Sequence, residues 1–342
     1  MAKKERILWM DLLNIFACIG VLILHTNSVT VHQFDGKVNC DFIWGILTHS
    51  LFYWPVPVFL MLSGSNIIGY TGGVKKFIQG RTRRTLFPFV AWSIVYAVLY
   101  NVNHPTHIFH ASTIHSAVNG LLGLGYMWFF IPLFAFYLSA PFLSLIMQNA
   151  SANERRTFLV LGFVFASIIP FISSITGVEI FRYNLFPMTG SLLVYPVLGW
   201  MICHDNWFDN HHKAIYTVAI ICAIVHFAGL YTTIVSLDLE SKVFQNTLFP
   251  TNFIISTAIF LFFKRQNWNK FVSTLRLTPE RIVAISSCSL GVYLIQNFLF
   301  VVSSFGFDIL NNHYFGFIAT YIVGVICVTI MKRIPLVKNI VP

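Results

Sequence analysis

Long apolar runs separated by short polar segments extend along this chain from one end to the other. A membrane-spanning helix needs roughly 20 mostly apolar residues. Ten runs approach or exceed that length, at residues 7–29, 42–68, 85–101, 125–147, 157–175, 185–203, 214–236, 248–264, 282–304 and 314–331. No internal repeat or low-complexity linker divides them. The pattern therefore predicts an all-α, polytopic integral membrane protein with about ten transmembrane helices, in one domain over residues 1–342.

Composition excludes several classes of protein. The 342 residues are 56% hydrophobic and 10% charged, whereas soluble domains carry about 25% charged residues. The six cysteines form no CxxC pair, so neither a zinc site nor a disulfide framework is indicated. Lys-Lys-Glu-Arg before the first apolar run resembles the start of a signal peptide, but no cleavage site follows. We therefore expect a retained first helix and no water-soluble enzyme.

The net charge of +10 is best explained by topology. If both termini are cytoplasmic, 19 of the 22 basic residues fall on the cytoplasmic side, and Lys37, Arg182 and Lys242 are the exceptions. Cytoplasmic loops of membrane proteins carry such an excess. The charge thus predicts that both termini are cytoplasmic and that the protein spans the cytoplasmic membrane of a bacterial cell. Membrane lipids are then its expected surroundings, and no nucleic-acid partner is expected.

The first apolar run contains a polar stripe. Asp11, Asn14, Cys18 and His25 fall on one helical face, and ionisable groups inside a membrane are costly enough to suggest function. His25 lies near the outer end, roughly 25 Å from the cytoplasmic start of the run. A neutral imidazole there can accept a proton from an alcohol; the alternative is a histidine that bonds a neighbouring helix. His49, in the second run, is expected near His25.

His226 has no such neighbour in the sequence and is assigned a structural role. His104, His107, His110 and His115 have metal-like spacing, but no acidic residue or cysteine completes the set. We therefore expect no metal site.

Three other segments carry candidate binding residues. Ser63 lies in a segment of prolines and small residues that favours either close helix packing or an unwound, cavity-lining stretch. Arg81, Arg83 and Arg84 precede the third run, where they either bind phosphates or add ordinary cytoplasmic charge. Trp128 is either a platform for a sugar ring or a residue of the interfacial aromatic belt.

These segments together resemble the integral-membrane acyltransferase type 3 family. The matching pieces are Asp-Leu-Leu followed by His25, the segment ending in Ser-Gly64, Arg81-x-x-Arg84 with Pro88 and Trp92, Met127-Trp128-Phe129, and Ser289-Leu-Gly-Val-Tyr293. They occur in the family's order along almost the whole chain.

The resemblance implies roles for particular residues. His25 matches the family's essential histidine, and Arg81 and Arg84 match the basic pair associated with acyl-coenzyme A (acyl-CoA). The chain also departs from the family pattern. Asn14 stands where the family usually has an arginine, and Gln296 stands where a histidine is common.

The resulting hypothesis is an O-acyltransferase that uses cytoplasmic acyl-CoA, with acetyl-CoA as the expected donor, and a cell-surface or lipid-linked glycan as acceptor. His25 acts with Asn14 and His49, the three arginines bind the donor, and Trp128, Ser63 and Tyr293 contact substrate. His25 acts either as a general base or as a covalent relay. The alternatives are a glycan transporter or flippase, and a non-catalytic partner in polysaccharide synthesis. Homo-oligomerisation is left open.

Overall fold

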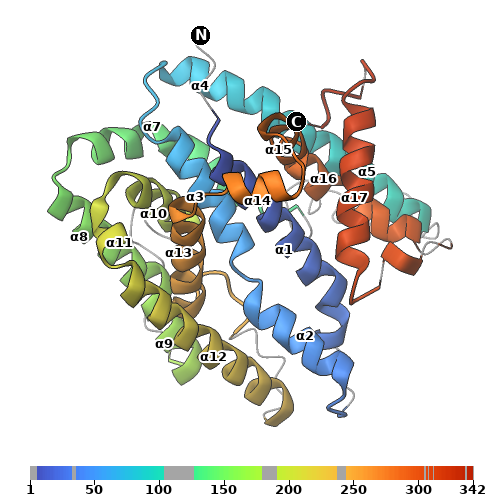
Figure 1. Cartoon of the computed structure of the whole chain (residues 1–342), viewed down its shortest axis with the longest axis horizontal. Helices are drawn as coiled ribbons and strands as arrows, with labels where there is room; N and C mark the ends of the chain where they lie inside the picture. The colour runs from blue at the N-terminus through green and yellow to red at the C-terminus, as the bar shows by residue number, and fades with distance from the viewer. Residues whose placement is uncertain are drawn as a thin grey trace. The chain divides into compact units, whose positions relative to one another are not determined.

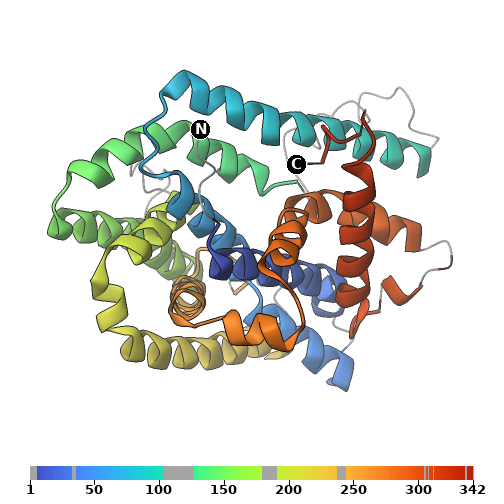
Figure 2. The ribbon, with the colours of Figure 1, turned by 45° about the horizontal axis from the view of Figure 1, so that its top comes forward.

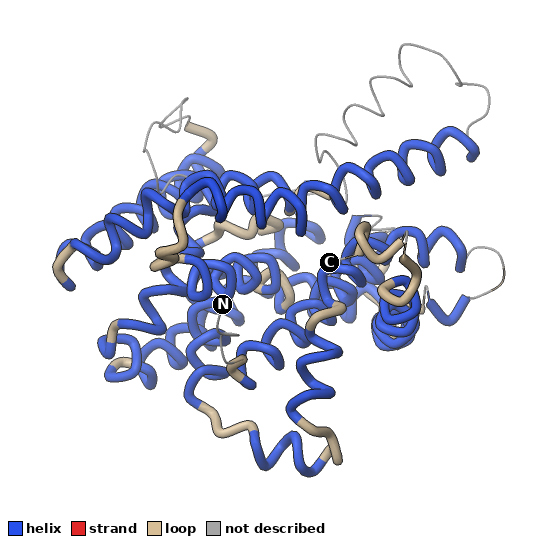
Figure 3. Tube along the Cα trace, turned by 90° about the horizontal axis from the view of Figure 1, so that it is seen from above, coloured by secondary structure: helices blue, strands red, loops and turns tan. Residues whose placement is uncertain are grey.

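A computed structural model of the chain describes residues 6–32, 36–103, 127–178, 191–236, 244–303, 306, 308–310, 312–335 and 337–341. Within these ranges the regular elements are all helices (Figure 3). The chain divides into two compact units. Unit 1 comprises Met1–Gly69 and Phe142–Ser286, and unit 2 comprises Tyr70–Pro141 and Ser287–Pro342.

Unit 1 contains most of the helices. They are α1 (Leu8–His32), α2 (Cys40–Leu51), α3 (Pro55–Ile67), α8 (Ala152–Phe163), the π-helix η3 (Val164–Ile168), α9 (Ile169–Thr176), the 3₁₀ turn η4 (Ser191–Leu193), α10 (Val194–His204), α11 (Asn206–Asn210), α12 (His212–Ser236), α13 (Pro250–Arg265), α14 (Asn269–Thr274) and α15 (Pro279–Ser286). Helix α7 (Phe130–Asn149) begins in unit 2 and ends in unit 1.

Helix α10 forms the centre of unit 1. Every residue from Val194 to Ile202 is buried, as expected for a helix that is apolar on all sides. Its closest neighbour is α3 (Figure 1). Gly64 of α3 lies against the Pro196 backbone, and Gly199 of α10 lies against the Met61 backbone. Because glycine has no side chain, the two helix backbones approach each other directly at these positions.

Helices α12 and α13 also pack together; α13 is seen nearly end-on in Figure 2. The side of α12 that carries Ile220, Ile221, Ile224 and Val225 is exposed. A large exposed aliphatic surface of this kind is expected where a helix faces lipid.

The second predicted apolar run, residues 42–68, is a broken helix. Asn39 caps the start of α2 by accepting a hydrogen bond from the Phe42 N–H at 2.8 Å. Helix α2 ends at Leu51, and α3 begins with Pro55 in its first turn. Proline suits that position because its missing N–H has no partner there in any helix.

Unit 2 contains α4 (Val74–Arg81), the π-helix η1 (Thr82–Leu86), α5 (Phe87–Asn103), α16 (Ser289–Ser303), the 3₁₀ turn η5 (Asp308–Leu310) and α17 (Gly316–Met331). Helices α16 and α17 interlock: Gly291 lies against Val328, and Gly324 lies against Val292.

The opposite face of α17 carries isoleucines four residues apart. They are exposed, at positions Ile318, Ile322, Ile326 and Ile330. This stripe has the spacing of one helical face, and it is suited to contact with lipid.

Each of the ten predicted apolar runs overlaps helical segments of the described chain, so the all-α class is confirmed for the described residues. By length and composition, five of these segments can cross a membrane, and a sixth can if α15 and α16 form one bent span. Helices α10 and α17 are shorter apolar helices. These helices are typical of a multi-pass membrane protein. The total of ten spans and the orientation stay predictions.

Candidate functional site

His25 lies in the C-terminal half of α1 and is half-buried. Helix α2 runs back along α1 (Figure 1). A Cβ added to Gly20 would lie 2.7 Å from the Pro55 ring and 3.2 Å from the Phe52 ring, so these residues mark a level common to both helices. His25 and His49 lie about 7 Å and 5 Å beyond that level in the same direction, at 1.5 Å per residue. The two histidines predicted near one another therefore share one level of unit 1.

His49 belongs to a cluster of rings in unit 1. It is 3% exposed, and its ring lies 6.0 Å from that of Tyr53, which in turn lies 6.3 Å from the ring of His226. His226 Nδ1 pairs with Thr251 Oγ1 of α13 at 2.7 Å. The bond to a neighbouring helix agrees with the structural role expected of His226. Sequence reasoning missed Tyr53 and Thr251, because nothing in the spacing of the apolar runs shows that α2, α12 and α13 meet here.

The N-terminal half of the α1 stripe is occupied by internal contacts. Asn14 donates to the carbonyl oxygen of Ser286 at 2.8 Å and to its hydroxyl at 2.9 Å. Asp11 pairs with Arg6 at 2.9 Å. Asn14 therefore holds α1 against the end of α15, and His25 is the member of the stripe nearest the C-terminal end of α1.

Ser63 bonds within its own helix, since its hydroxyl donates to the Phe59 carbonyl at 2.8 Å. The neighbouring Gly64 makes the close approach to α10 described above. Of the two structures that the sequence allowed for this segment, the helix is continuous and closely packed.

The arginines predicted to bind the donor lie in unit 2. The Arg81 guanidinium stands over two rings, 5.4 Å from the Phe77 centroid and 5.3 Å from that of Tyr137. Arg83 and Arg84 are exposed and lie in the π-helix η1. A single π-helical turn is rare and frequently marks a functional site. Arg81 is thus held by aromatic packing, while Arg83 and Arg84 extend into the surroundings.

Other basic residues gather at the same end of unit 2. Trp92, near the start of α5, donates from Nε1 to the Ile340 carbonyl at 3.0 Å, which holds the C-terminal tail beside that helix. Lys332 Nζ donates to the Ser287 carbonyl at 2.9 Å, just before α16 begins. The end of α17, the tail and the starts of α5 and α16 therefore lie together. We call this region the basic end; its cationic residues are Arg81, Arg83, Arg84, Lys332, Arg333 and Lys338.

The sequence of unit 2, which contains the basic end, is poor in acidic residues. The sequence of unit 2 contains one acidic residue, Asp308, which lies at the opposite end of α16 and α17 from their basic termini. In the described residues, Arg83 and Arg84 make no ion pair, and the four ion-pair contacts of the structure all lie in unit 1.

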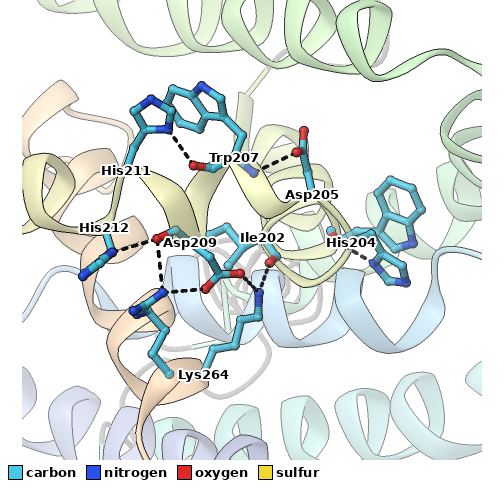
Figure 4. Close-up of polar contacts among 10 residues, drawn as sticks. Ile202, His204, Asp205, Trp207, Asp209, His211, His212 and Lys264 are labelled. Carbon is cyan, nitrogen blue, oxygen red and sulfur yellow. Dashed lines mark hydrogen bonds and ion pairs between the residues drawn. The ribbon is translucent and has the colours of Figure 1, made fainter.

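In unit 1, the described residues Arg156, Lys264 and Arg265 pair with carboxylates. Lys264 Nζ lies 2.6 Å from an Asp209 carboxylate oxygen and 2.7 Å from the Ile202 carbonyl, and Arg265 contacts the same carboxylate at 3.2 Å (Figure 4). Arg156 holds Asp205 through two hydrogen bonds, of 2.8 and 2.9 Å. Those bonds to the guanidinium lower the pKa of Asp205 below its ordinary value.

Three histidines between the end of α10 and the start of α12 form hydrogen bonds to backbone carbonyls. His204, His211 and His212 each donate from Nδ1 to a carbonyl three or four residues earlier (Figure 4). The polar groups between α10 and α12 thus stabilise the turn itself, and they carry no excess positive charge toward a ligand.

Two further residues predicted to contact substrate lie in unit 2. Trp128 is 37% exposed. Tyr293 is buried, with its ring 5.8 Å from Phe129 and 6.1 Å from Phe130. Trp128 thus offers an accessible ring, whereas Tyr293 packs inside the unit.

The histidines at 104, 107, 110 and 115, together with Arg182 and Lys242, lie outside the described residues. Within the described ranges no group of three or more histidine, cysteine or acidic residues is placed to hold a metal ion.

Comparison with known proteins identifies a single family. The family model for an acyltransferase domain, type 3, matches residues 7–332. The matched range includes His25, the three arginines and Tyr293. No curated protein and no solved structure matches the chain.

Proposed function

We propose a reaction for this chain, which belongs to the acyltransferase type 3 family: it transfers an acyl group from cytoplasmic acyl-CoA to a hydroxyl of a cell-surface or lipid-linked glycan. Acetyl-CoA is the proposed donor. The observation that carries the proposal is the pair Arg83 and Arg84, which are exposed and make no ion pair among the described residues, in a unit whose sequence contains one acidic residue.

The basic end suits the phosphates of coenzyme A. Arg83 and Arg84 are exposed and have no carboxylate to compete for them in the described chain. Guanidinium groups bind phosphate through paired, charge-assisted hydrogen bonds. Arg81, fixed between Phe77 and Tyr137, holds the end of α4 in place and adds its charge. In this proposal unit 2 therefore binds the donor.

His25 of unit 1 activates the acceptor. Its imidazole takes the proton of a glycan hydroxyl while the oxygen attacks the thioester carbon. The carbon–sulfur bond then breaks, and the imidazolium returns the proton to the departing thiolate. A covalent route, in which the imidazole first takes the acyl group itself, uses the same residue.

The remaining candidates support these two tasks. Asn14 fixes α1, which carries His25, against α15 through its two bonds to Ser286. His49 lies at the level of His25 and is the second imidazole available for proton transfer. Trp128 offers an exposed ring on which a sugar can stack. Ser63 and Tyr293 contribute through the packing of α3 and α16.

The test is acyl transfer by the purified chain in lipid nanodiscs, supplied with labelled acetyl-CoA and extracted membrane glycans. Wild type is expected to label the glycan and release coenzyme A thiol. His25→Ala is expected to lower the rate about 10²- to 10⁴-fold, the usual contribution of a general base. His211→Ala is the control, because this exposed histidine bonds only to the backbone of its own turn. Normal transfer by His25→Ala, or none by wild type, would contradict the proposal; a glycan transporter would give the second result.

A further inference from the structure

Helix α16 carries a buried polar stripe that the proposed reaction does not yet use. Ser289, Tyr293, Gln296 and Ser303 are spaced four, three and seven residues apart, which places them on one helical face. All four are buried, with exposed fractions of 1%, 8%, 1% and 0%. Such a stripe within an apolar helix is costly unless its polar atoms are bonded.

Gln296 is the member of the stripe whose bonding is incomplete. Neither its carbonyl oxygen nor its amide nitrogen has a hydrogen-bond partner among the described residues. One turn earlier, the Tyr293 ring packs on Phe129 and Phe130, so the surroundings of this face are aromatic and apolar. A buried carboxamide with both ends unbonded carries a desolvation penalty that a ligand with a donor and an acceptor can remove.

The distance along α16 between the basic end and Gln296 can be worked out from the helix rise. Lys332 bonds Ser287, two residues before α16 starts at Ser289. Gln296 lies seven residues further along, about 10 Å at the rise of an α-helix. A ligand that bound the basic end through an anionic group and extended an arm along α16 would therefore reach the level of Gln296.

We infer that Gln296 binds an amide of the pantetheine arm of the acyl-CoA donor, an inference that rests on the proposed function. The arm contains two amides, each with one N–H and one C=O, and it extends from the diphosphate toward the thioester. The carboxamide of Gln296 accepts from an amide N–H and donates to an amide carbonyl. Gln296 is thus a binding residue for the part of the donor that carries no charge.

The experiment compares two probes on the full-length protein in nanodiscs. Coenzyme A has the pantetheine arm, and adenosine 3′,5′-bisphosphate lacks it but keeps phosphate groups. Gln296→Met, which has a similar length and no hydrogen-bonding amide, is expected to weaken coenzyme A binding about 3- to 10-fold, the value of one or two neutral hydrogen bonds. Binding of adenosine 3′,5′-bisphosphate stays unchanged. Ile295→Met, the adjacent buried position, is the matched control.

A second readout separates binding from structure. Without ligand, Gln296→Met should melt no lower than wild type, because it removes a buried amide that has no partner. A lower melting temperature would mean that the amide is bonded within the protein, and would overturn the inference. Unchanged coenzyme A affinity, or an equal loss for both probes, would overturn it as well, as would an effect confined to the KM of the glycan. If wild type binds neither probe, the proposed function itself fails.

Discussion

The close crossing of α3 and α10 makes unit 1 sensitive to a single methyl group. A Cβ added to Gly64 would lie 2.5 Å from the Pro196 carbonyl carbon, and one added to Gly199 would lie 2.6 Å from the Met61 carbonyl carbon. Ordinary carbon contacts are about 3.5–4.0 Å. Because the obstacle is backbone, no side chain can rotate away. Gly64→Ala therefore requires the two helices to separate by about 1 Å.

The size of the penalty follows from the contacts that this separation weakens. A gap of 0.5–1 Å forfeits about a quarter to a half of each pair's attraction of 0.1–0.2 kcal/mol. Over roughly 50–100 atom pairs, the number that one or two buried leucines make, the loss is about 2–5 kcal/mol. The better helix propensity of alanine returns about 1 kcal/mol. The packing loss is larger than the propensity gain, and we expect a net destabilisation of about 1–4 kcal/mol, close to the roughly 1–3 kcal/mol typical of overpacked cores.

The assay is unfolding by sodium dodecyl sulfate in mixed micelles, followed by tryptophan fluorescence, since the buried Trp200 lies in α10 itself. Gly80→Ala is the matched control, because a Cβ there meets no atom within 4 Å; it should be neutral or slightly stabilising. The double variant Gly64→Ala, Gly199→Ala should lose less than the two single losses together, because the first substitution already separates the helices. Equal stability of Gly64→Ala and Gly80→Ala would refute the close crossing.

Two further predictions concern charge. Replacing Arg83 and Arg84 together by glutamine should weaken coenzyme A binding at least tenfold, since each charge-assisted bond is worth about 1.5–3 kcal/mol. Lys213→Gln removes an exposed cation of unit 1 and should have no effect. Equal coenzyme A affinity of wild type, the double variant and Lys213→Gln would exclude the basic end as the donor site. Arg156 lowers the pKa of Asp205 in the folded state, so this pair stabilises the fold above the unfolded aspartate pKa of about 3.9 and loses that effect as pH falls through the folded value. Measured as thermal stability against pH, the advantage of wild type over Asp205→Asn should therefore be constant at neutral pH and disappear under acid conditions, and an advantage independent of pH would show that the carboxylate charge is not involved.

The sequence was sufficient for the elements of the fold but not for their contacts. Apolar length predicted the long helical segments, because membrane solvation acts on every run separately, but it did not predict the short helices α4, α11 and α14. It did not predict that Gly64 lies against the Pro196 backbone, since the partner lies on a helix far along the chain. Pro55 is a residue type that favours a helix break at that point, but the sequence did not show that Pro55 and Phe52 pack against Gly20 of α1.

The candidate site was predictable only in part for the same reason. His25, His49 and the arginines stood out as polar or charged residues at special places in apolar runs. Asn14 was chosen because of its position before His25, yet its partner Ser286 depends on how α15 packs against α1. The incomplete bonding of Gln296 is a property of the folded helix alone, and the sequence showed only that a histidine is common at that position in similar proteins.

The measurement that tests the central claim most directly is mass spectrometry of surface and lipid-linked glycans from three matched cell lines. One line carries the wild-type chain, one carries His25→Ala at equal abundance, and one lacks the chain. Acyl transfer predicts that glycans from the first line alone carry the added mass of an acyl group, removable by mild base as an ester. The same acylated glycans in all three lines, or in the first two, would contradict the account.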